Sequence, residues 1–169
     1  MVEADHEVAL EDTDRIHGRS AFVNNVKAAV ALSGAVRSTL GPKGLDKMLV
    51  DGDGDATVTN DGVTVLETAK VEHPTARLLV STSSAQDRAA RDGTTTAVIL
   101  TSELLQNSLE LVREGVDPTV ILNGYRIALS EAQDELERIS KSCIGEEQMR
   151  SAVATSLSGK VDSAVGDHL

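Results

Sequence analysis

The chain has three prolines, Pro42, Pro74 and Pro118, and each stands at a boundary between stretches of helical periodicity. Proline lacks a backbone N–H and its ring clashes with the preceding turn, so it ends a helix or occupies the first turn of one. Between these boundaries, apolar residues recur every three to four positions, the spacing of one helix face. The pattern predicts helices over about 22–39, 63–69, 74–91, 94–114, 118–140 and 146–154, with a loop over 155–160.

The side chains available for a core are almost entirely aliphatic. Hydrophobic residues make up 40% of the chain, yet Phe22 and Tyr125 are its only Phe, Tyr or Trp residues. The core is therefore expected to consist of Val, Leu, Ile and Ala. After Pro74 the expected apolar face comprises Leu78, Leu79, Thr82 and Ala85. After Pro118 it comprises Val120, Ile121, Gly124, Ile127, Ala128, Glu131 and Ala132, with Leu136 and Ile139 beyond.

One short segment breaks the helical pattern. Residues 47–50 and 56–59 read as two strands, and the aspartates and glycines of 51–55 read as the turn between them. The aspartates also suggest a calcium loop, but its sixth position would be Ala56 rather than Gly and its twelfth Gly62 rather than Glu. A hairpin is the better interpretation, and the whole pattern predicts a mainly α-helical fold with one small β-hairpin.

The charge of the chain excludes several classes of partner. A formal net charge of −11 is unlike a nucleic-acid surface, which needs clustered Lys and Arg, and it disfavours anionic membranes. An acidic excess is typical of adaptation to high salt, which predicts stability or solubility that rises with salt. Cys143 is the only cysteine, so no disulfide framework or cysteine metal site is expected. With no apolar run of membrane length and no signal peptide, we expect a cytoplasmic protein.

The segment from Asp92 to Thr96 has the composition of a phosphate site. It places an acid, a glycine and three hydroxyls where a helical pattern begins. A helix start carries free N–H groups and a partial positive charge that suit a phosphate. Asp92 would repel a bare phosphate but could hold the Mg²⁺ that accompanies a nucleotide. The alternative is that Asp92 simply caps the helix. The familiar P-loop and dinucleotide glycine patterns are both absent.

Four turns carry residues of this kind, and two flanking segments accompany them. They are Leu40-Gly41-Pro42, Asn60-Asp61-Gly62, Asp92 to Thr96 and Ser158-Gly159-Lys160, with 43–50 and Glu72-His73-Pro74 beside them. Their order and spacing closely resemble the group II chaperonins, the archaeal thermosome and the eukaryotic cytosolic chaperonin, over about residues 14–160. The resemblance implies part of an equatorial domain, the ATP-binding domain of those subunits.

The resemblance also implies a role for each turn, with ATP and Mg²⁺ as cofactors. Asp92 matches an aspartate that holds Mg²⁺, and Asp61 matches one that helps to orient the attacking water. Phosphate contacts are implied for Leu40, Gly41, Pro42, Gly93, Thr94, Thr95 and Thr96, and Lys160 lies in a loop that senses the terminal phosphate. This division of roles suits phosphoryl transfer, which depends on positioning, a metal and an oriented water.

Residues 1–18 are polar and charged without a sustained period, which predicts a mobile arm. The resemblance implies the first half of the equatorial domain over 19–143 and the start of an intermediate domain over 144–169. The hairpin over 47–59 resembles one that pairs with strands of a neighbouring subunit in a ring. Unfolded client proteins would bind regions that this chain does not contain.

Two departures from the family pattern bear on activity. Arg91 stands where the family has glycine, which would strain the loop if the position needs a backbone angle that only glycine adopts easily. Arg88 stands where the family tends to be acidic. Two function classes therefore stay open. One is an ATPase subunit of a chaperonin seen as a partial chain; the other is a non-enzymatic module that binds nucleotide weakly or acts only in subunit assembly.

Overall fold

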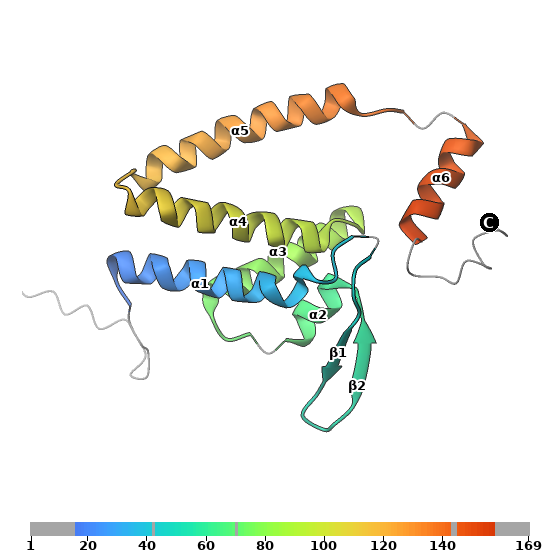
Figure 1. The fold of residues 1–169 in the computed structure, drawn as a ribbon, viewed down its shortest axis with the longest axis horizontal. Coiled ribbons are helices and arrows are strands. Elements are labelled where there is room, and N and C mark those ends of the chain that lie inside the picture. Colours follow the sequence, from blue (N-terminus) through green and yellow to red (C-terminus); the bar gives the residue numbers. More distant parts are fainter. Residues whose placement is uncertain (1–15, 42, 70, 143–144, 158–169) are drawn as a thin grey trace, which may run out of the picture.

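The fold is built on two long helices that lie side by side, α1 (Gly18–Arg37) and α4 (Thr94–Arg113), as Figure 1 shows. The computed structural model describes residues 16–41, 43–69, 71–142 and 145–157. Helix α3 (Pro74–Ala90) packs against both α1 and α4, and the short α2 (Gly62–Thr68) contacts all three. Pro74 and Pro118 both occupy the first turn of a helix, as the sequence predicts.

The core lies between these four helices and is aliphatic, as predicted. Its buried members are Ala29, Leu32 and Val36 of α1, Val65 and Leu66 of α2, Ala76 and Leu79 of α3, and Val98 of α4. Three almost fully buried serines, Ser33, Ser83 and Ser102, accompany them.

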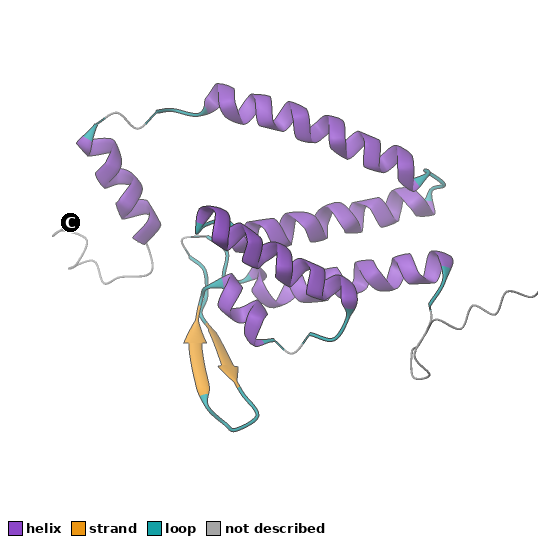
Figure 2. Ribbon diagram, turned by 180° about the vertical axis from the view of Figure 1, so that it is seen from behind, coloured by secondary structure: helices purple, strands orange, loops and turns teal. Residues whose placement is uncertain are grey.

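A two-stranded antiparallel sheet projects from this bundle. Strand β1 (Lys47–Val50) pairs with β2 (Ala56–Thr59), and Figure 2 shows the pair extending away from the helices. The carboxylate Oδ1 of Asp51 accepts hydrogen bonds from the backbone N–H groups of Asp53 and Asp55, both at 2.9 Å. The acidic run therefore builds the hairpin turn. The predicted fold class, mainly α-helical with one small hairpin, is confirmed.

Helix α5 (Pro118–Ile139) turns back along α4 and then leaves the core. Its start is capped by Asp117, which accepts a hydrogen bond from the Thr119 N–H at 2.7 Å. Tyr125 donates a hydrogen bond from its hydroxyl to the Leu104 carbonyl of α4 at 2.7 Å. Ile121 is the only buried residue of α5. A further helix, α6 (Glu146–Leu157), follows after a short connection.

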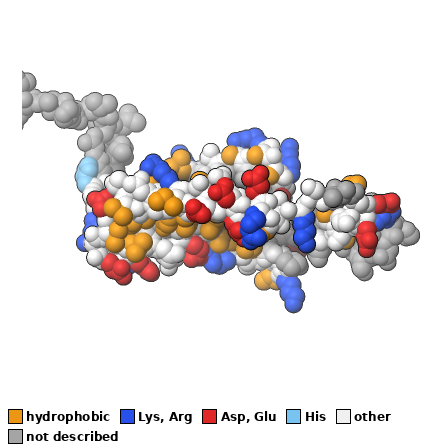
Figure 3. Space-filling model, turned by 90° about the horizontal axis from the view of Figure 1, so that it is seen from above, with side chains coloured by type: hydrophobic (Ala, Val, Ile, Leu, Met, Phe, Trp, Pro, Cys, Tyr) orange, Lys and Arg blue, Asp and Glu red, His pale blue; other side chains and the backbone are white. Residues whose placement is uncertain are grey.

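The predicted apolar face of α5 is thus largely exposed. Figure 3 shows hydrophobic side chains gathered on the side of the molecule where α5 lies. The exposed large hydrophobic residues of α5 are Val120, Leu122, Ile127, Leu129, Leu136 and Ile139. In the described part of the chain, no helix is long and apolar enough to cross a bilayer.

Three details differ from the sequence prediction. Helix α1 begins at Gly18 rather than near 22; of the predicted arm over 1–18, residues 1–15 lie outside the described part. The predicted loop over 155–160 is wrong for 155–157, because α6 continues to Leu157. The predicted face of α3 is right for Leu79, which is buried, but wrong for Leu78, Thr82 and Ala85, which are exposed, while Ser83 is fully buried. The buried residues of α3 are Ala76, Leu79 and Ser83.

Candidate functional site

The first turns of α2 and α4 meet at one contact, between Gly62 and Thr95. A Cβ atom added to Gly62 would lie 2.1 Å from the Thr95 side-chain oxygen Oγ1 and 3.5 Å from the Thr95 Cα. Both residues are buried. No side chain larger than hydrogen fits at position 62 without a shift, so glycine allows this approach. Two turns that lie about thirty residues apart in sequence are thereby brought together, as the candidate site requires.

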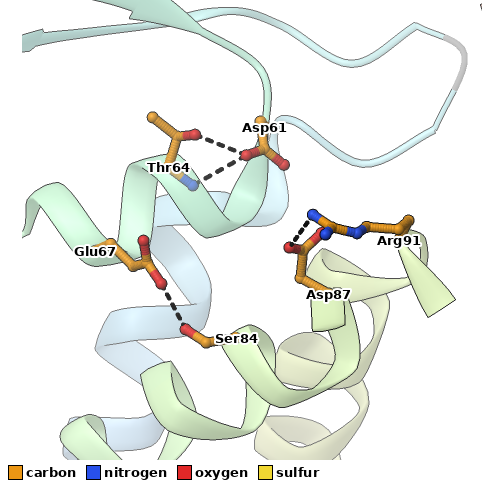
Figure 4. A network of polar contacts seen from close by, with 6 residues as sticks. All are labelled: Asp61, Thr64, Glu67, Ser84, Asp87 and Arg91. Carbon is orange, nitrogen blue, oxygen red and sulfur yellow. Dashed lines mark hydrogen bonds and ion pairs between the residues drawn. The ribbon is translucent and has the colours of Figure 1, made fainter. Parts of the chain in front are cut away.

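Asp61 is the N-cap of α2. Its Oδ2 atom accepts hydrogen bonds from the Thr64 backbone N–H at 3.1 Å and from the Thr64 hydroxyl at 2.7 Å (Figure 4). Glu67, one turn further along α2, accepts a hydrogen bond from the Ser84 hydroxyl of α3 at 2.7 Å. The two hydrogen bonds from Thr64 fix the orientation of the Asp61 carboxylate, whose Oδ1 atom has no hydrogen-bond partner within the described residues.

Asp92 does not cap α4, so the capping alternative is wrong for this residue. The N-cap is Gly93, which has a left-handed backbone (φ 74°), and no side chain caps the helix there. The Asp92 Oδ1 atom accepts from the Gly93 N–H at 2.7 Å, and the Gln86 side chain donates to the Asp92 carbonyl at 2.9 Å. The start of α4 is therefore an open helix N-terminus with a carboxylate beside it.

Thr94, Thr95 and Thr96 form the first turn of α4. Thr94 and Thr95 are buried against the bundle, whereas Thr96 is exposed. The Gly93 carbonyl accepts the first intrahelical bond, from Ala97 at 2.9 Å. The N–H groups ahead of Ala97 have no carbonyl within the helix to bond, as at any helix start. They are the donors that an anion at this end of α4 would meet.

Arg91 ends α3 with a left-handed backbone, at φ 57° and ψ 17°. Among the described residues it is the only non-glycine with positive φ. Its N–H bonds to the Asp87 carbonyl at 2.9 Å, and its Nη1 atom lies 3.4 Å from Asp87 Oδ2. The position does prefer glycine, as the sequence suggested, because a Cβ atom in this region costs free energy.

The loop after α1 lies at the same end of the bundle, near the end of α3 and the start of α4 (Figures 1 and 2). Gly41 has a left-handed backbone (φ 86°), and its carbonyl accepts a hydrogen bond from the Gly44 N–H at 2.9 Å. A Cβ on Gly44 would lie 2.2 Å from the Thr39 carbonyl oxygen. Leu40 is about half exposed. Pro42 and Lys160, two predicted site residues, lie outside the described residues.

The structure thus brings together the turns at Asp61, Asp92 and Leu40. Sequence reasoning missed Gln86, which holds the Asp92 turn, and Thr64, which orients Asp61. Neither carries a sequence signal of its own: Gln86 is one polar residue on a polar helix end, and Thr64 is three residues beyond an aspartate. The close packing of Gly62 on Thr95 was also missed, although Gly62 itself stood in a recognised turn.

Comparison with known proteins identifies the family. The family model of the TCP-1/cpn60 chaperonins matches residues 32–169. The chain is 49% identical over 162 residues, or 96% of its length, to thermosome subunit alpha of Thermoplasma acidophilum. It is 46% identical over 161 residues to thermosome subunit alpha of Archaeoglobus fulgidus, and 44% identical over 154 residues to thermosome subunit 3 of Haloferax volcanii.

The match covers most of this chain but a smaller part of its relatives. It covers 96% and 94% of this chain for the first two relatives, but the chain spans only about 30% of the length of each. The resemblance to the group II chaperonins seen in the sequence is confirmed by these thermosome relatives. The helical bundle with its small hairpin is consistent with part of a chaperonin equatorial domain. The chain belongs to the TCP-1/cpn60 chaperonin family.

Proposed function

We propose that this chain is the ATP-binding part of a thermosome-like group II chaperonin subunit, which as a whole couples ATP hydrolysis to protein folding. The observation that carries the proposal is the uncapped start of α4 with Asp92 beside it and Asp61 held close by. An open helix N-terminus attracts phosphate through free N–H groups and the helix dipole. Glycine at the N-cap forgoes about a few tenths of a kcal/mol relative to a capping side chain, which a bound phosphate would offset.

The phosphate chain of the nucleotide would lie along this end of the bundle. Gly93 and the threonines from Thr94 to Thr96 would supply backbone N–H groups and hydroxyls. The loop with Leu40, Gly41 and Pro42 would approach from the end of α1, and Lys160 would sense the terminal phosphate. The left-handed glycines at 41 and 93 support close approach of phosphate to the backbone, since they carry no side chain in the way.

The residues fit a magnesium ion that comes with the nucleotide. No group of three or more metal-ligating side chains exists in the described part of the chain, so a site formed by protein ligands alone has no support there. Mg²⁺ usually takes one or two carboxylates and completes its shell with phosphate oxygens and water. Asp92 is exposed and only its Oδ1 atom has a hydrogen-bond partner within the described residues, so Oδ2 is free to serve as that ligand.

Asp61 is proposed to orient the attacking water. Its Oδ2 atom caps α2, which holds the carboxylate in place and directs Oδ1 away from the cap. A carboxylate fixed in this way can accept a hydrogen bond from water without reorganising, which is how preorganised groups lower a barrier. Asp61 is thus both a helix cap and the proposed catalytic residue.

The wider assignments follow from the family. Residues 19–143 are proposed as the first half of the equatorial domain and 144–169 as the start of the intermediate domain. The hairpin would pair with a neighbouring subunit in a ring, and client proteins would bind elsewhere in the whole subunit. We place this activity in the cytoplasm. The comparisons favour this proposal over a non-enzymatic module.

Calorimetry of nucleotide binding tests the proposal. The 169-residue chain is expected to bind ATP weakly, and more tightly with Mg²⁺ than with a chelator. Asp92→Ala should remove the magnesium dependence, whereas Asp61→Ala should keep it and, in a whole subunit, slow turnover by about 10²–10³. Asp117→Ala is the control, because it removes an aspartate at the opposite end of α4. Equal binding with and without Mg²⁺ by the wild type would overturn the proposal.

Thermal or urea unfolding of the same variants gives an independent check. Asp92 accepts no hydrogen bond from the first turn of α4, so Asp92→Ala should change the free energy of unfolding by less than about 0.5 kcal/mol. A capping aspartate would instead contribute about 0.5–2 kcal/mol. A loss in that range for Asp92→Ala would mean that its role is structural.

A further inference from the structure

Arg91 lies beside the proposed nucleotide site, and the family assignments give it no role. It is fixed between the last turn of α3 and the Asp92–Gly93 turn, and its backbone N–H bonds to the Asp87 carbonyl at 2.9 Å. The left-handed backbone at Arg91 is a less favourable conformation for any residue with a Cβ atom. The chain therefore keeps a charged side chain at a position where glycine would be more stable.

The guanidinium of Arg91 is only weakly held. Its one ionic partner among the described residues is Asp87, at 3.4 Å, and the Arg91 side chain is 81% exposed. Exposed pairs of this geometry contribute little to stability. Only Nη1 takes part, so Nε and Nη2 keep N–H donors for another acceptor. Figure 4 shows the side chain directed toward Asp87, with Asp61 on the neighbouring turn.

The acidic residues around the Asp92–Gly93 turn would repel a nucleotide, so a positively charged group is needed there. Asp61, Asp87 and Asp92 are all acidic, while a nucleotide brings further negative charge that one Mg²⁺ offsets only in part. A guanidinium matches the oxygens of a phosphate with two parallel hydrogen bonds, and it stays charged at every physiological pH. Arg91 is the basic residue next to Asp92 in the chain, with no intervening residue to separate it from the phosphate turn.

We propose, on the basis of the function proposed above, that Arg91 is a phosphate-contacting residue of the nucleotide site. Its guanidinium keeps Asp87 on one edge and offers its other edge to the phosphate chain of the bound nucleotide. Asp87 then orients the side chain, which reduces the entropy that Arg91 loses when the nucleotide binds. Because the attraction grows with the negative charge of the ligand, Arg91 favours the triphosphate over the diphosphate.

The test measures Mg-ATP and Mg-ADP affinities of the full chain by calorimetry for three variants. Arg91→Ala removes the charge but keeps a non-glycine residue at the left-handed position. Arg91→Lys keeps the charge without the planar fork. Arg88→Ala removes an equal charge three residues away on α3 and serves as the matched control. We expect Arg91→Ala to weaken Mg-ATP about tenfold or more, Mg-ADP less, Arg91→Lys to lie between, and Arg88→Ala to stay within about threefold.

The outcomes separate this inference from the function on which it rests. If the wild type binds Mg-ATP and Arg91→Ala binds it equally well or more tightly, the inference is wrong and the proposed function stands. If Arg88→Ala loses as much affinity as Arg91→Ala, the effect is general electrostatics and the inference is again wrong. If the wild type binds neither nucleotide, the proposed function is wrong, and the inference that rests on it is wrong as well.

Discussion

Replacing Gly62 by alanine tests whether the approach of α2 to α4 depends on the missing side chain. The new Cβ would lie 2.1 Å from Thr95 Oγ1 and 3.3 Å from Thr95 Cβ, whereas non-bonded carbon atoms pack at about 3.5–4.0 Å. Thr95 is itself buried, so it cannot simply turn into solvent. Extra atoms in a packed site cost about 1–3 kcal/mol. Alanine in a helix gains about 0.5–1 kcal/mol over glycine, which leaves a net loss of up to about 2.5 kcal/mol.

The assay is urea unfolding followed by circular dichroism, with Gly34→Ala as the matched control. Gly34 lies inside α1, and a Cβ there would meet no atom within 4 Å. Gly34→Ala should therefore raise the free energy of unfolding by about 0.5–1 kcal/mol, while Gly62→Ala should lower it. The opposite signs come from the same chemical change, so a general effect of alanine on helices cannot produce both.

A second variant locates the clash. Thr95→Ala removes the Oγ1 atom that the new Cβ would meet, so Gly62→Ala should cost less in a Thr95→Ala background than in the wild type. The coupling free energy between the two sites is expected to reach about 0.5–3 kcal/mol, the range for residues in contact. Gly62→Ala that is as stable as Gly34→Ala, or additive behaviour in the double variant, would refute the argument.

Four further predictions concern Arg91, Ser83, Asp117 and the exposed face of α5. Arg91→Gly should raise the free energy of unfolding by about 0.5–1 kcal/mol, because glycine tolerates the left-handed backbone; urea unfolding measures it. Ser83→Ala should raise it by about 1 kcal/mol, since the buried Ser83 hydroxyl has no hydrogen-bond partner among the described residues; an equal loss would indicate a water bound there. Hydrogen bonds from Thr119 lower the pKa of Asp117 below its usual 3.8, so the stability gap between wild type and Asp117→Ala should be full at neutral pH and shrink as pH falls below 3.8. The exposed face of α5 should bind a hydrophobic dye and cause self-association at moderate salt; a clean monomer without dye binding would contradict this.

Most of the fold could be predicted because the boundaries of its helices and strands are set by residues that lie close together in the sequence. Pro74 and Pro118 start helices, and Asp117 caps the second of them. The turn over 51–55 is closed by an aspartate, and the strands on either side occupy the predicted residues. These features depend on residues a few positions apart, so sequence alone determines them. The face of α3 failed because burial there depends on which helix packs closely, which periodicity does not record.

The candidate site could be predicted only in part. The turns at Asp61 and Asp92 were both recognised, but as sequence they look alike: an acid before a glycine at the start of a helix. The structure separates them, because Asp61 caps α2 through Thr64 and Asp92 leaves α4 uncapped. That difference depends on the backbone angles of the two glycines, Gly62 in the helix and Gly93 left-handed. No residue type specifies those angles in advance.

Two unfavourable local features lie close together, at the end of α3 and the start of α4. Arg91 has a left-handed backbone without being glycine, and two residues later α4 begins without a side-chain cap. Glycine at 91 would recover the cost of the first feature, whereas a serine cap at 93 would itself be strained, because the backbone at Gly93 is left-handed (φ 74°). Packing does not force arginine at 91, since its side chain is 81% exposed. Local rules broken without a compensating contact are typical of sites that a ligand completes. A phosphate between the Arg91 guanidinium and the N–H groups of α4 would offset both costs at once, which is why the two features should be tested together.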